Sequence, residues 1–263
     1  MAPVTTPSTP PAQPAQPAPS ACRVALATME EVPADDDWLG PRARARCAAL
    51  RVGRRQRDWR LGRFAACRLL CAELGLAPAD RARVEVLSAP DGAPEAWLDG
   101  RPLGLALSLS HRGGLAACAL GPAGPGLGVD LERIEPRSPA FVEEWFQPEE
   151  VRWIRAAGDP ALAANLGWSA KESALKVLRT GLRLDPRRVR VEVGEAVEGP
   201  WAALHIEVEG AGALAGWWTR VGEGLLTCAW RPPAGPPPTR VGEGGPPFTR
   251  GVLADRPALR PPR

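Results

Sequence analysis

The sequence predicts an α+β fold, in which helices are mixed with antiparallel hairpins instead of alternating strictly with strands. Three observations favour this class. Long segments place apolar residues at helical spacing, short segments place them at every second position, and glycine-rich turns separate several of the short segments. Apolar residues make up 44% of the 263-residue chain and charged residues 24%, which is the balance of a globular protein with a large core.

The first predicted helix spans residues 58–76. Leu61, Phe64 and Leu69 recur at helical spacing within it, and Gly75 closes it. A turn with two glycines joins the last two of the strands that follow, which indicates a hairpin. These strands are expected at 84–87, 96–98, 105–110 and 115–120.

Two further helices are predicted after this hairpin, at 141–157 and 160–179. A glycine-rich turn at 222–224 joins the last two predicted strands and is typical of a hairpin. Strands are expected at 127–134, 189–193, 204–208, 215–220 and 225–230.

Both ends of the chain have the composition of disordered segments. Residues 1–22 are rich in Pro, Ala, Gln, Ser and Thr, and residues 233–263 are rich in Pro and Gly. The hexapeptide T-R-V-G-E-G occurs at 219–224 and again at 239–244. A single repeat does not indicate a solenoid.

Composition excludes several classes of protein. The net charge of +3 is too small to indicate a nucleic-acid partner. The six cysteines form no CxxC pair, which fits a reducing, cytoplasmic setting. The start of the chain lacks the basic and apolar segments of a secretory signal. The uncharged run 115–129 is broken by prolines and glycines, so no membrane-spanning helix is expected.

Asp130 and Glu132 are candidates for a metal site. They lie two residues apart in a predicted strand, so their side chains share one face while Val129 and Leu131 share the other. Neighbouring carboxylates repel each other, and a hard cation such as Mg²⁺ relieves this repulsion by taking oxygen ligands. Two acids at a solvent-facing strand edge are the alternative, and the pair alone favours that alternative.

The only two lysines of the chain, Lys171 and Lys176, lie in one predicted helix. Glu172 and Lys176 are four residues apart and share a stripe of that helix. Glu172 would complete a magnesium site of three carboxylates, and Lys176 would meet a phosphate oxygen. A surface Glu–Lys pair is the alternative, but it does not explain why both lysines lie here.

Ser110 and His111 stand at the end of the strand that precedes a turn. A histidine and a hydroxyl at a strand end can bind a phosphate. A surface histidine in a turn is the alternative. The other histidine, His205, alternates with apolar residues in a predicted strand, which favours a structural role.

Together, three segments resemble the signature regions of the 4′-phosphopantetheinyl transferases. They are Ser110-His111, Gly128-Val129-Asp130-Leu131-Glu132 and Trp168-Ser169-Ala170-Lys171-Glu172-Ser173-Ala174-Leu175-Lys176, in that order. The third, W-S-x-K-E-[SA]-x-x-K, is the most specific, and the first is weak by itself. The resemblance covers roughly residues 38–230. Within the superfamily the chain looks like the long, monomeric type that activates surfactin synthetase.

The resemblance implies a metal site and a catalytic group. Asp130, Glu132 and Glu172 would hold Mg²⁺, or Mn²⁺, against the pyrophosphate of the co-substrate coenzyme A. Glu172 would also be the base that accepts the proton of the attacking serine. Lys176 would touch the pyrophosphate and stabilise the transition state, with Lys171 assisting.

The resemblance also implies contacts to coenzyme A. Ser110 and His111 would contact the phosphates of its 3′-phosphoadenosine diphosphate moiety. Arg101 lies in a G-R-P segment similar to the family's G-[KR]-P, and is a candidate contact for the 3′-phosphate or the adenine pocket. Arg63 lies in an L-G-R helix similar to one that supplies basic residues to coenzyme A. Cys67 departs from the pattern, because many relatives carry Lys or Arg there.

The fold implied by the resemblance is two similar α+β halves in a pseudo-twofold arrangement, with the active site between them. The first half would span 23–127 and the second 128–232. The implied partner is an apo acyl- or peptidyl-carrier protein. Residues 141–153, with Trp145, Phe146 and Trp153, are a candidate docking region; burial of these aromatics in the core is the alternative.

Two other functions stay open for the same residues. A magnesium-dependent phosphodiesterase or pyrophosphatase would use the three acids without a carrier protein. A non-catalytic module would bind coenzyme A or the carrier protein alone. A nucleic-acid-binding module built on the arginine-rich segment 42–68 would leave the acids and lysines unexplained.

Overall fold

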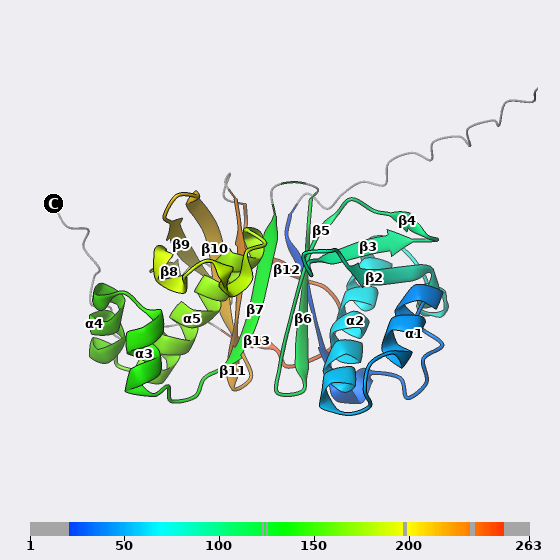
Figure 1. Ribbon diagram of the computed structural model, residues 1–263, viewed down its shortest axis with the longest axis horizontal. Helices are drawn as coiled ribbons and strands as arrows, with labels where there is room; N and C mark the ends of the chain where they lie inside the picture. Colours follow the sequence, from blue (N-terminus) through cyan, green and yellow to red (C-terminus); the bar gives the residue numbers. More distant parts are fainter. Residues whose placement is uncertain (1–20, 123, 125, 197–198, 232–234, 250–263) are drawn as a thin grey trace, which may run out of the picture.

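The computed structural model describes residues 21–122, 124, 126–196, 199–231 and 235–249. Its mixture of helices and mainly antiparallel sheets confirms the predicted α+β class. Two sheets stand in the middle of the molecule, and helices cover the outer side of each (Figure 1). On one side lie α1 (Pro41–Ala48) and α2 (Arg54–Glu73), and on the other α3 (Pro139–Trp145), α4 (Pro148–Ala156) and α5 (Pro160–Val177).

The first sheet has the strand order β12-β1-β6-β5. Its strands are β12 (Thr239–Arg240), β1 (Arg23–Thr28), β6 (Leu115–Gly121) and β5 (Ala106–Arg112). A small separate sheet lies beside it and consists of β2 (Val84–Ser88), β3 (Pro94–Leu98) and β4 (Arg101–Pro102). We call β1 to β6 with α1 and α2 the first lobe.

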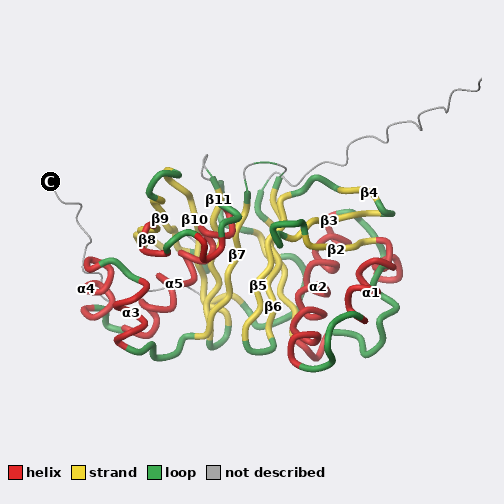
Figure 2. The backbone as a smooth tube through the Cα atoms, viewed as in Figure 1, coloured by secondary structure: helices red, strands yellow, loops and turns green. Residues whose placement is uncertain are grey.

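The second sheet has the order β7-β11-β10-β9-β8 (Figure 2). Its strands are β7 (Leu127–Arg133), β11 (Gly224–Trp230), β10 (Gly212–Val221), β9 (Ala202–Val208) and β8 (Val189–Ala196). Strand β13 (Phe248–Thr249) also pairs with β10. We call β7 to β11 with α3, α4 and α5 the second lobe. In each lobe the first strand pairs with the last, which pairs with the strand before it. The twofold relation and the boundary at residue 127 stay predictions.

The two sheets bury one apolar layer between them. Val24 and Leu26 of β1 contribute to this layer from one side, and Val129 and Leu131 of β7 from the other. Residues alternate between the faces of a strand, so Asp130 and Glu132 turn toward α5. The prediction that Val129 and Leu131 enter the core is confirmed, and Asp130 is only 6% exposed, unlike an acid on a solvent-facing edge.

Helix α5 lies directly against β7 because Gly128 has no side chain. A Cβ at Gly128 would stand 1.9 Å from the carbonyl oxygen of Ser173. The helix is also held on β11 by hydroxyls, since Thr227 Oγ1 lies 2.9 Å from Ser169 Oγ and 2.7 Å from Ser173 Oγ. The serines of the W-S-x-K-E-S segment therefore set the distance between the helix and the sheet.

The predicted helix 141–157 is wrong as a single element. It is two helices, because Pro148 cannot continue a helix and the residue before a proline avoids helical dihedrals. Phe146 is extended, with φ −120° and ψ 153°. The sequence analysis also missed β1 and α1.

The predicted disorder of residues 233–263 is wrong for residues 235–249. There β12 pairs in parallel with β1, and β13 pairs antiparallel with β10. The amide of Thr239 donates to the carbonyl of Cys22, just before β1, at 2.9 Å, and the amide of Val241 donates to the carbonyl of Val24 in β1 at 2.8 Å. The ring of Phe248 packs edge-on against Trp201. The edge of β1 and this aromatic contact compensate for the low apolar content of the segment.

The second copy of T-R-V-G-E-G begins in β12, and the first copy covers the end of β10 and its turn. The predicted leader, residues 1–22, lies almost wholly outside the described residues. None of the helices in the described ranges combines the length and apolarity that a membrane crossing needs.

Candidate functional site

The two lobes meet where β5 lies beside β7 without sharing a sheet. Serine hydroxyls join the strands here in place of a backbone ladder. Ser108 Oγ accepts a hydrogen bond from the amide of Val129 at 2.9 Å, and Ser110 Oγ accepts one from the amide of Leu131 at 3.2 Å. This seam fixes β5 against the strand that carries the two acids.

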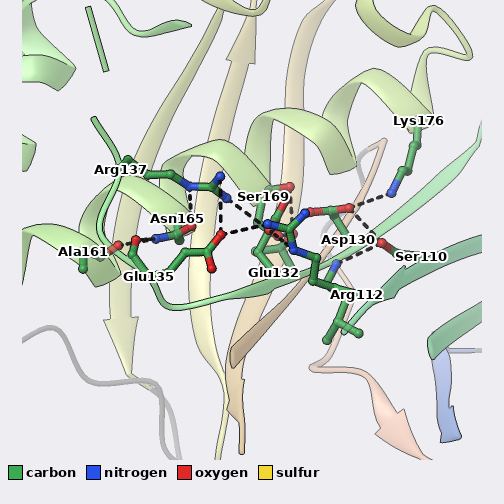
Figure 3. A network of polar contacts seen from close by, with 12 residues as sticks. Ser110, Arg112, Asp130, Glu132, Glu135, Arg137, Ala161, Asn165, Ser169 and Lys176 are labelled. Atoms are coloured by element: carbon green, nitrogen blue, oxygen red, sulfur yellow. Dashed lines mark hydrogen bonds and ion pairs between the residues drawn. The ribbon is translucent and has the colours of Figure 1, made fainter. Parts of the chain in front are cut away.

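Asp130 lies at the centre of the site. Its Oδ1 accepts from Ser110 Oγ at 2.9 Å and from Lys176 Nζ at 2.8 Å (Figure 3). Lys176 also donates to the carbonyl of Val129 at 2.8 Å. The second oxygen, Oδ2, is buried and has no hydrogen-bond partner. A buried acceptor without a donor is costly unless a cation or a donor reaches it.

Glu132 lies next to Asp130 on the same face of β7. Its Oε2 is 3.1 Å from Arg137 and 3.4 Å from Arg112. Burial raises the pKa of Glu132, and the charge of Asp130 raises it further, although the two arginines oppose this. The two carboxylates therefore lie within each other's field.

Glu172 approaches these acids from α5, one turn before Lys176. Burial raises the pKa of Glu172; Lys176 opposes this, while Asp130 and Glu132 add to it. Within the described ranges Glu172 makes no hydrogen bond or ion pair. The structure thus brings together four of the predicted residues, Asp130, Glu132, Glu172 and Lys176, with Ser110 beside them.

A divalent cation fits this group of oxygens on one observation, the buried and unpaired Oδ2 of Asp130. The charge of Asp130 raises the pKa values of Glu132 and Glu172, and a bound cation would relieve this repulsion. As the side chains stand, no three acid, histidine or cysteine groups in the described part of the chain are close enough to share a metal. Glu172, whose carboxylate no hydrogen bond or ion pair holds among the described residues, is the acid that is free to turn toward the other two.

The predicted contact of Lys171 with coenzyme A is wrong. Its side chain is fully buried on another face of α5, where Nζ donates to Glu150 at 2.8 Å and to the carbonyls of Pro186 and Val189. These three acceptors use all three donors of the ammonium. Lys171 therefore ties α5 to α4 and to the start of β8, and it does not reach the site.

Arg63 and His111 line a hollow of about 470 Å³ in the first lobe, with Trp59 and Leu109. We call it the smaller hollow. The Arg63 guanidinium lies 4.9 Å from the centre of the Trp59 ring and 3.4 Å from Ser88 Oγ. No carboxylate among the described residues pairs with it, and burial lowers the pKa of Arg63 to about 10. A buried cation without a counter-charge is a candidate contact for an anion.

The other basic candidates of the first lobe lie elsewhere. Arg101 is exposed on β4 and is not brought to the acids. Cys67 is buried and burial raises its pKa to about 12, so it cannot replace a basic residue. Its neighbour Arg68 is paired with Glu31 at 2.5 Å. Arg55 also lines the smaller hollow without an acidic partner among the described residues but is exposed, so Arg63 is the buried arginine of this helix that lines the hollow unpaired.

A larger hollow, of about 840 Å³, lies between the lobes and shares Leu109 with the smaller one. Trp97 and Pro102 line it from the first lobe, and Lys176, Arg179 and Arg183 from the second. Arg179 pairs with Asp91 of the first lobe at 2.8 Å. Arg179 and Arg183 were not predicted from the sequence, although their position soon after Lys176 could have indicated that they lie near the same site.

Arg112, Arg137 and Asn165 were not predicted from the sequence either. In Figure 3, Arg112 and Arg137 reach Glu132, and Asn165 holds Arg137. Arg112 follows His111 directly, so the phosphate argument applied to His111 could have included it. No spacing rule points to Arg137 or Asn165, because they meet only after α5 has packed on β7.

Residues 126–212 match the model of a family described as the 4′-phosphopantetheinyl transferase superfamily. The matched segment runs from the residue before β7 to the first residue of β10, and it contains the three acids and Lys176. No curated protein matches the chain significantly. The predicted resemblance is therefore confirmed at the level of the superfamily for this segment, which lies in the second lobe.

Proposed function

We propose that this chain is a 4′-phosphopantetheinyl transferase of the long, monomeric type. It would transfer the 4′-phosphopantetheine group of coenzyme A to a serine of an apo carrier protein and release 3′,5′-ADP. The observation that carries the proposal is the meeting of Asp130, Glu132, Glu172 and Lys176 beside the seam between the lobes, within the segment that resembles the superfamily.

The charged residues of the two lobes suit different parts of the co-substrate: the first lobe offers contacts to the phosphates of coenzyme A, and the second holds a lysine and three acids near the reacting pyrophosphate. Coenzyme A carries several phosphate charges; the unpaired guanidinium of Arg63 offers a cation to them, and the ring of His111 offers a hydrogen-bond donor. Lys176 is held by Asp130 and Val129, so its ammonium is fixed near the acids. Bound Mg²⁺ or Mn²⁺ would neutralise the pyrophosphate as charge grows on the leaving group.

The serine hydroxyl of the carrier would attack the phosphorus nearest the pantetheine. A new P–O bond forms, the bond to 3′,5′-ADP breaks, and the serine proton goes to Glu172. Glu172 suits this role because no hydrogen bond or ion pair among the described residues occupies its carboxylate, and because it lies in the field of Asp130, Glu132 and Lys176. Lys176 would stabilise the charge on the transferring phosphate.

Carrier domains are typically acidic and helical, and the second lobe has a surface of suitable character. Trp145 and Trp153 are half-buried on α3 and α4, whereas Phe146 is buried in the core. Arg152 and Arg155 are exposed on α4. We propose that Trp145 and Trp153 with these arginines receive the carrier protein, in a cytoplasmic setting and with the transferase as a monomer.

Intact-mass spectrometry tests the proposal. An apo carrier protein incubated with the chain, coenzyme A and Mg²⁺ should gain the mass of one phosphopantetheine group, and EDTA should abolish the gain. Glu172→Gln should slow transfer by about 10²–10⁴-fold, the usual contribution of a positioned base. Arg155→Gln, on the exposed side of α4, tests docking and should leave coenzyme A binding unchanged.

Other outcomes would replace the proposal with one of its alternatives. Cleavage of coenzyme A without a mass gain would indicate a hydrolase. Tight coenzyme A binding with no gain for acyl- and peptidyl-carrier proteins alike would indicate a binding module. Full turnover by Glu172→Gln would remove the base from Glu172 but would leave the transferase in place.

A further inference from the structure

Arg137 follows β7 and folds back onto Glu132. Its Nε donates to Asn165 Oδ1 at 2.7 Å, and one terminal nitrogen, Nη2, lies 3.1 Å from Glu132 Oε2 (Figure 3). The guanidinium also lies 4.9 Å from the centre of the Phe141 ring. With its side chain only 16% exposed, Arg137 is held on several sides and cannot easily change rotamer.

Asn165 is the fixed point of this arrangement. It is fully buried in α5, and its Nδ2 donates to the carbonyls of Glu135 and Ala161 at 2.6 and 2.8 Å. These two acceptors orient the amide so that Oδ1 faces Arg137. Asn165 stands seven residues before Glu172, which is two helical turns, so both lie on the same side of α5.

Arg112 approaches the same oxygen of Glu132 but holds it less firmly. It lies 3.4 Å from Oε2, is 39% exposed, and makes a closer contact of 2.8 Å with Glu135. Half-exposed ion pairs are weak, because water competes and the long side chains lose entropy. Arg137 is therefore the cation that determines where the carboxylate of Glu132 lies.

We propose that Arg137, locked by Asn165, is the positioning residue that keeps the carboxylate of Glu132 beside Asp130 and Glu172. This inference rests on the proposed function, in which Glu132 is a metal ligand. A glutamate has three rotatable side-chain bonds, and without Arg137 the carboxylate would follow Arg112 toward Glu135 and the surface. Arg137 also neutralises the charge of Glu132, which opposes metal binding. The positioning of the carboxylate outweighs this effect, because a displaced ligand contributes nothing to a metal site.

The test is a titration of the full chain with Mn²⁺ alone, in which the electron paramagnetic resonance signal of free Mn²⁺ reports binding. Arg137→Met should weaken Mn²⁺ binding by about 10–100-fold, the usual effect of losing a group that orients a ligand. Arg137→Lys should recover part of the loss, and Asn165→Ala should give a smaller loss than Arg137→Met. Arg188→Met, which removes an exposed arginine paired with Glu209, should leave Mn²⁺ binding unchanged.

Equal or tighter Mn²⁺ binding by Arg137→Met, with wild-type binding intact, would overturn the inference and would make Arg137 a competitor of the metal. Loss of Mn²⁺ binding only in proportion to loss of folded protein, measured by circular dichroism of the same samples, would also overturn it. Failure of the wild-type chain to bind Mn²⁺, with or without coenzyme A, would instead refute the proposed metal site itself.

Discussion

The two lobes share one strand order but differ in whether the buried cation of each has an acidic partner. In the second lobe, Lys171 is paired with Glu150, and Lys176 with Asp130. In the first lobe, Arg63 is 9% exposed and has no acidic partner among the described residues. Burial of an unpaired cation opposes folding, and this cost is consistent with the proposed role of Arg63 as a contact for an anion.

Lys171 and Lys176 show the same contrast within one helix. Five residues of an α-helix turn the side chain by about 140°, so the two ammonium groups leave on different faces. One face packs against α4 and β8 and the other faces β7 and the site. The W-S-x-K-E-S segment therefore combines a residue for folding with residues for binding, and substitutions can separate the two roles.

The largest expected effect is on stability in the second lobe. Lys171→Met leaves Glu150 buried without a counter-charge and should lower the free energy of unfolding by about 3–5 kcal/mol. Adding Glu150→Leu should restore part of this, because it removes the unpaired buried charge but leaves the amides of Gln147 and Val191 without their acceptor. Urea denaturation of the single and double variants measures both. A double variant no more stable than Lys171→Met would show that the pair is not the cause.

Removal of the buried cation of the first lobe should not lower stability, in contrast to Lys171→Met in the second lobe. Arg63→Met removes a buried cation that no acid compensates, so stability should stay level or rise, while coenzyme A should bind about 10–100-fold more weakly. Thermal unfolding and calorimetric titration with coenzyme A provide the two readouts. Arg57→Met is the matched control, because Arg57 is exposed on the same helix. Unchanged affinity for coenzyme A would show that the unpaired Arg63 does not serve to bind it, and the proposed contrast between the lobes would be wrong.

The smallest effect concerns Glu172 and pH. Its pKa is raised in the folded chain, so the folded state binds a proton more tightly than the unfolded state. Stability is therefore lost as pH rises from the ordinary glutamate pKa through the raised one. Glu172→Gln should be more stable than the wild type at pH 8, and the difference should shrink toward pH 4.

Urea denaturation of both chains across this pH range measures the difference. Glu149→Gln is the control, because the pKa of Glu149 is lowered, so its contribution to stability is lost on acidification. A gain for Glu172→Gln that is the same at every pH would assign it to packing and not to charge.

Local spacing predicted the part of the site that depends on one element at a time. Alternation placed Asp130 and Glu132 on one face of a strand, and a spacing of four placed Glu172 with Lys176. The role of Lys171 could not be read in this way, because its partners come from α4 and from the start of β8. The break at Pro148 was predictable, since a proline in a helix interior is a strong local signal.

Partners that are distant in sequence account for what was missed in the fold. The apolar alternation of β1 is short, and β1 becomes a strand because β6 and β12 flank it. Residues 235–249 are rich in proline and glycine, so composition indicates disorder, whereas the free edge of β1 and the contact with Trp201 supply the compensating bonds. Composition indicates whether a segment can fold by itself. It does not show that an unpaired strand edge elsewhere in the chain will pair with that segment.

The pairing of β12 with β1 also bears on how the chain is made. A strand formed from the first described residues takes one neighbour from residues about 200 positions later, so the first sheet lacks that neighbour until those residues have been synthesised. During that interval β1 presents an open edge, and an open edge can pair with another chain. A chain that ended after β11 would contain every site residue named above, together with an unpaired edge on β1.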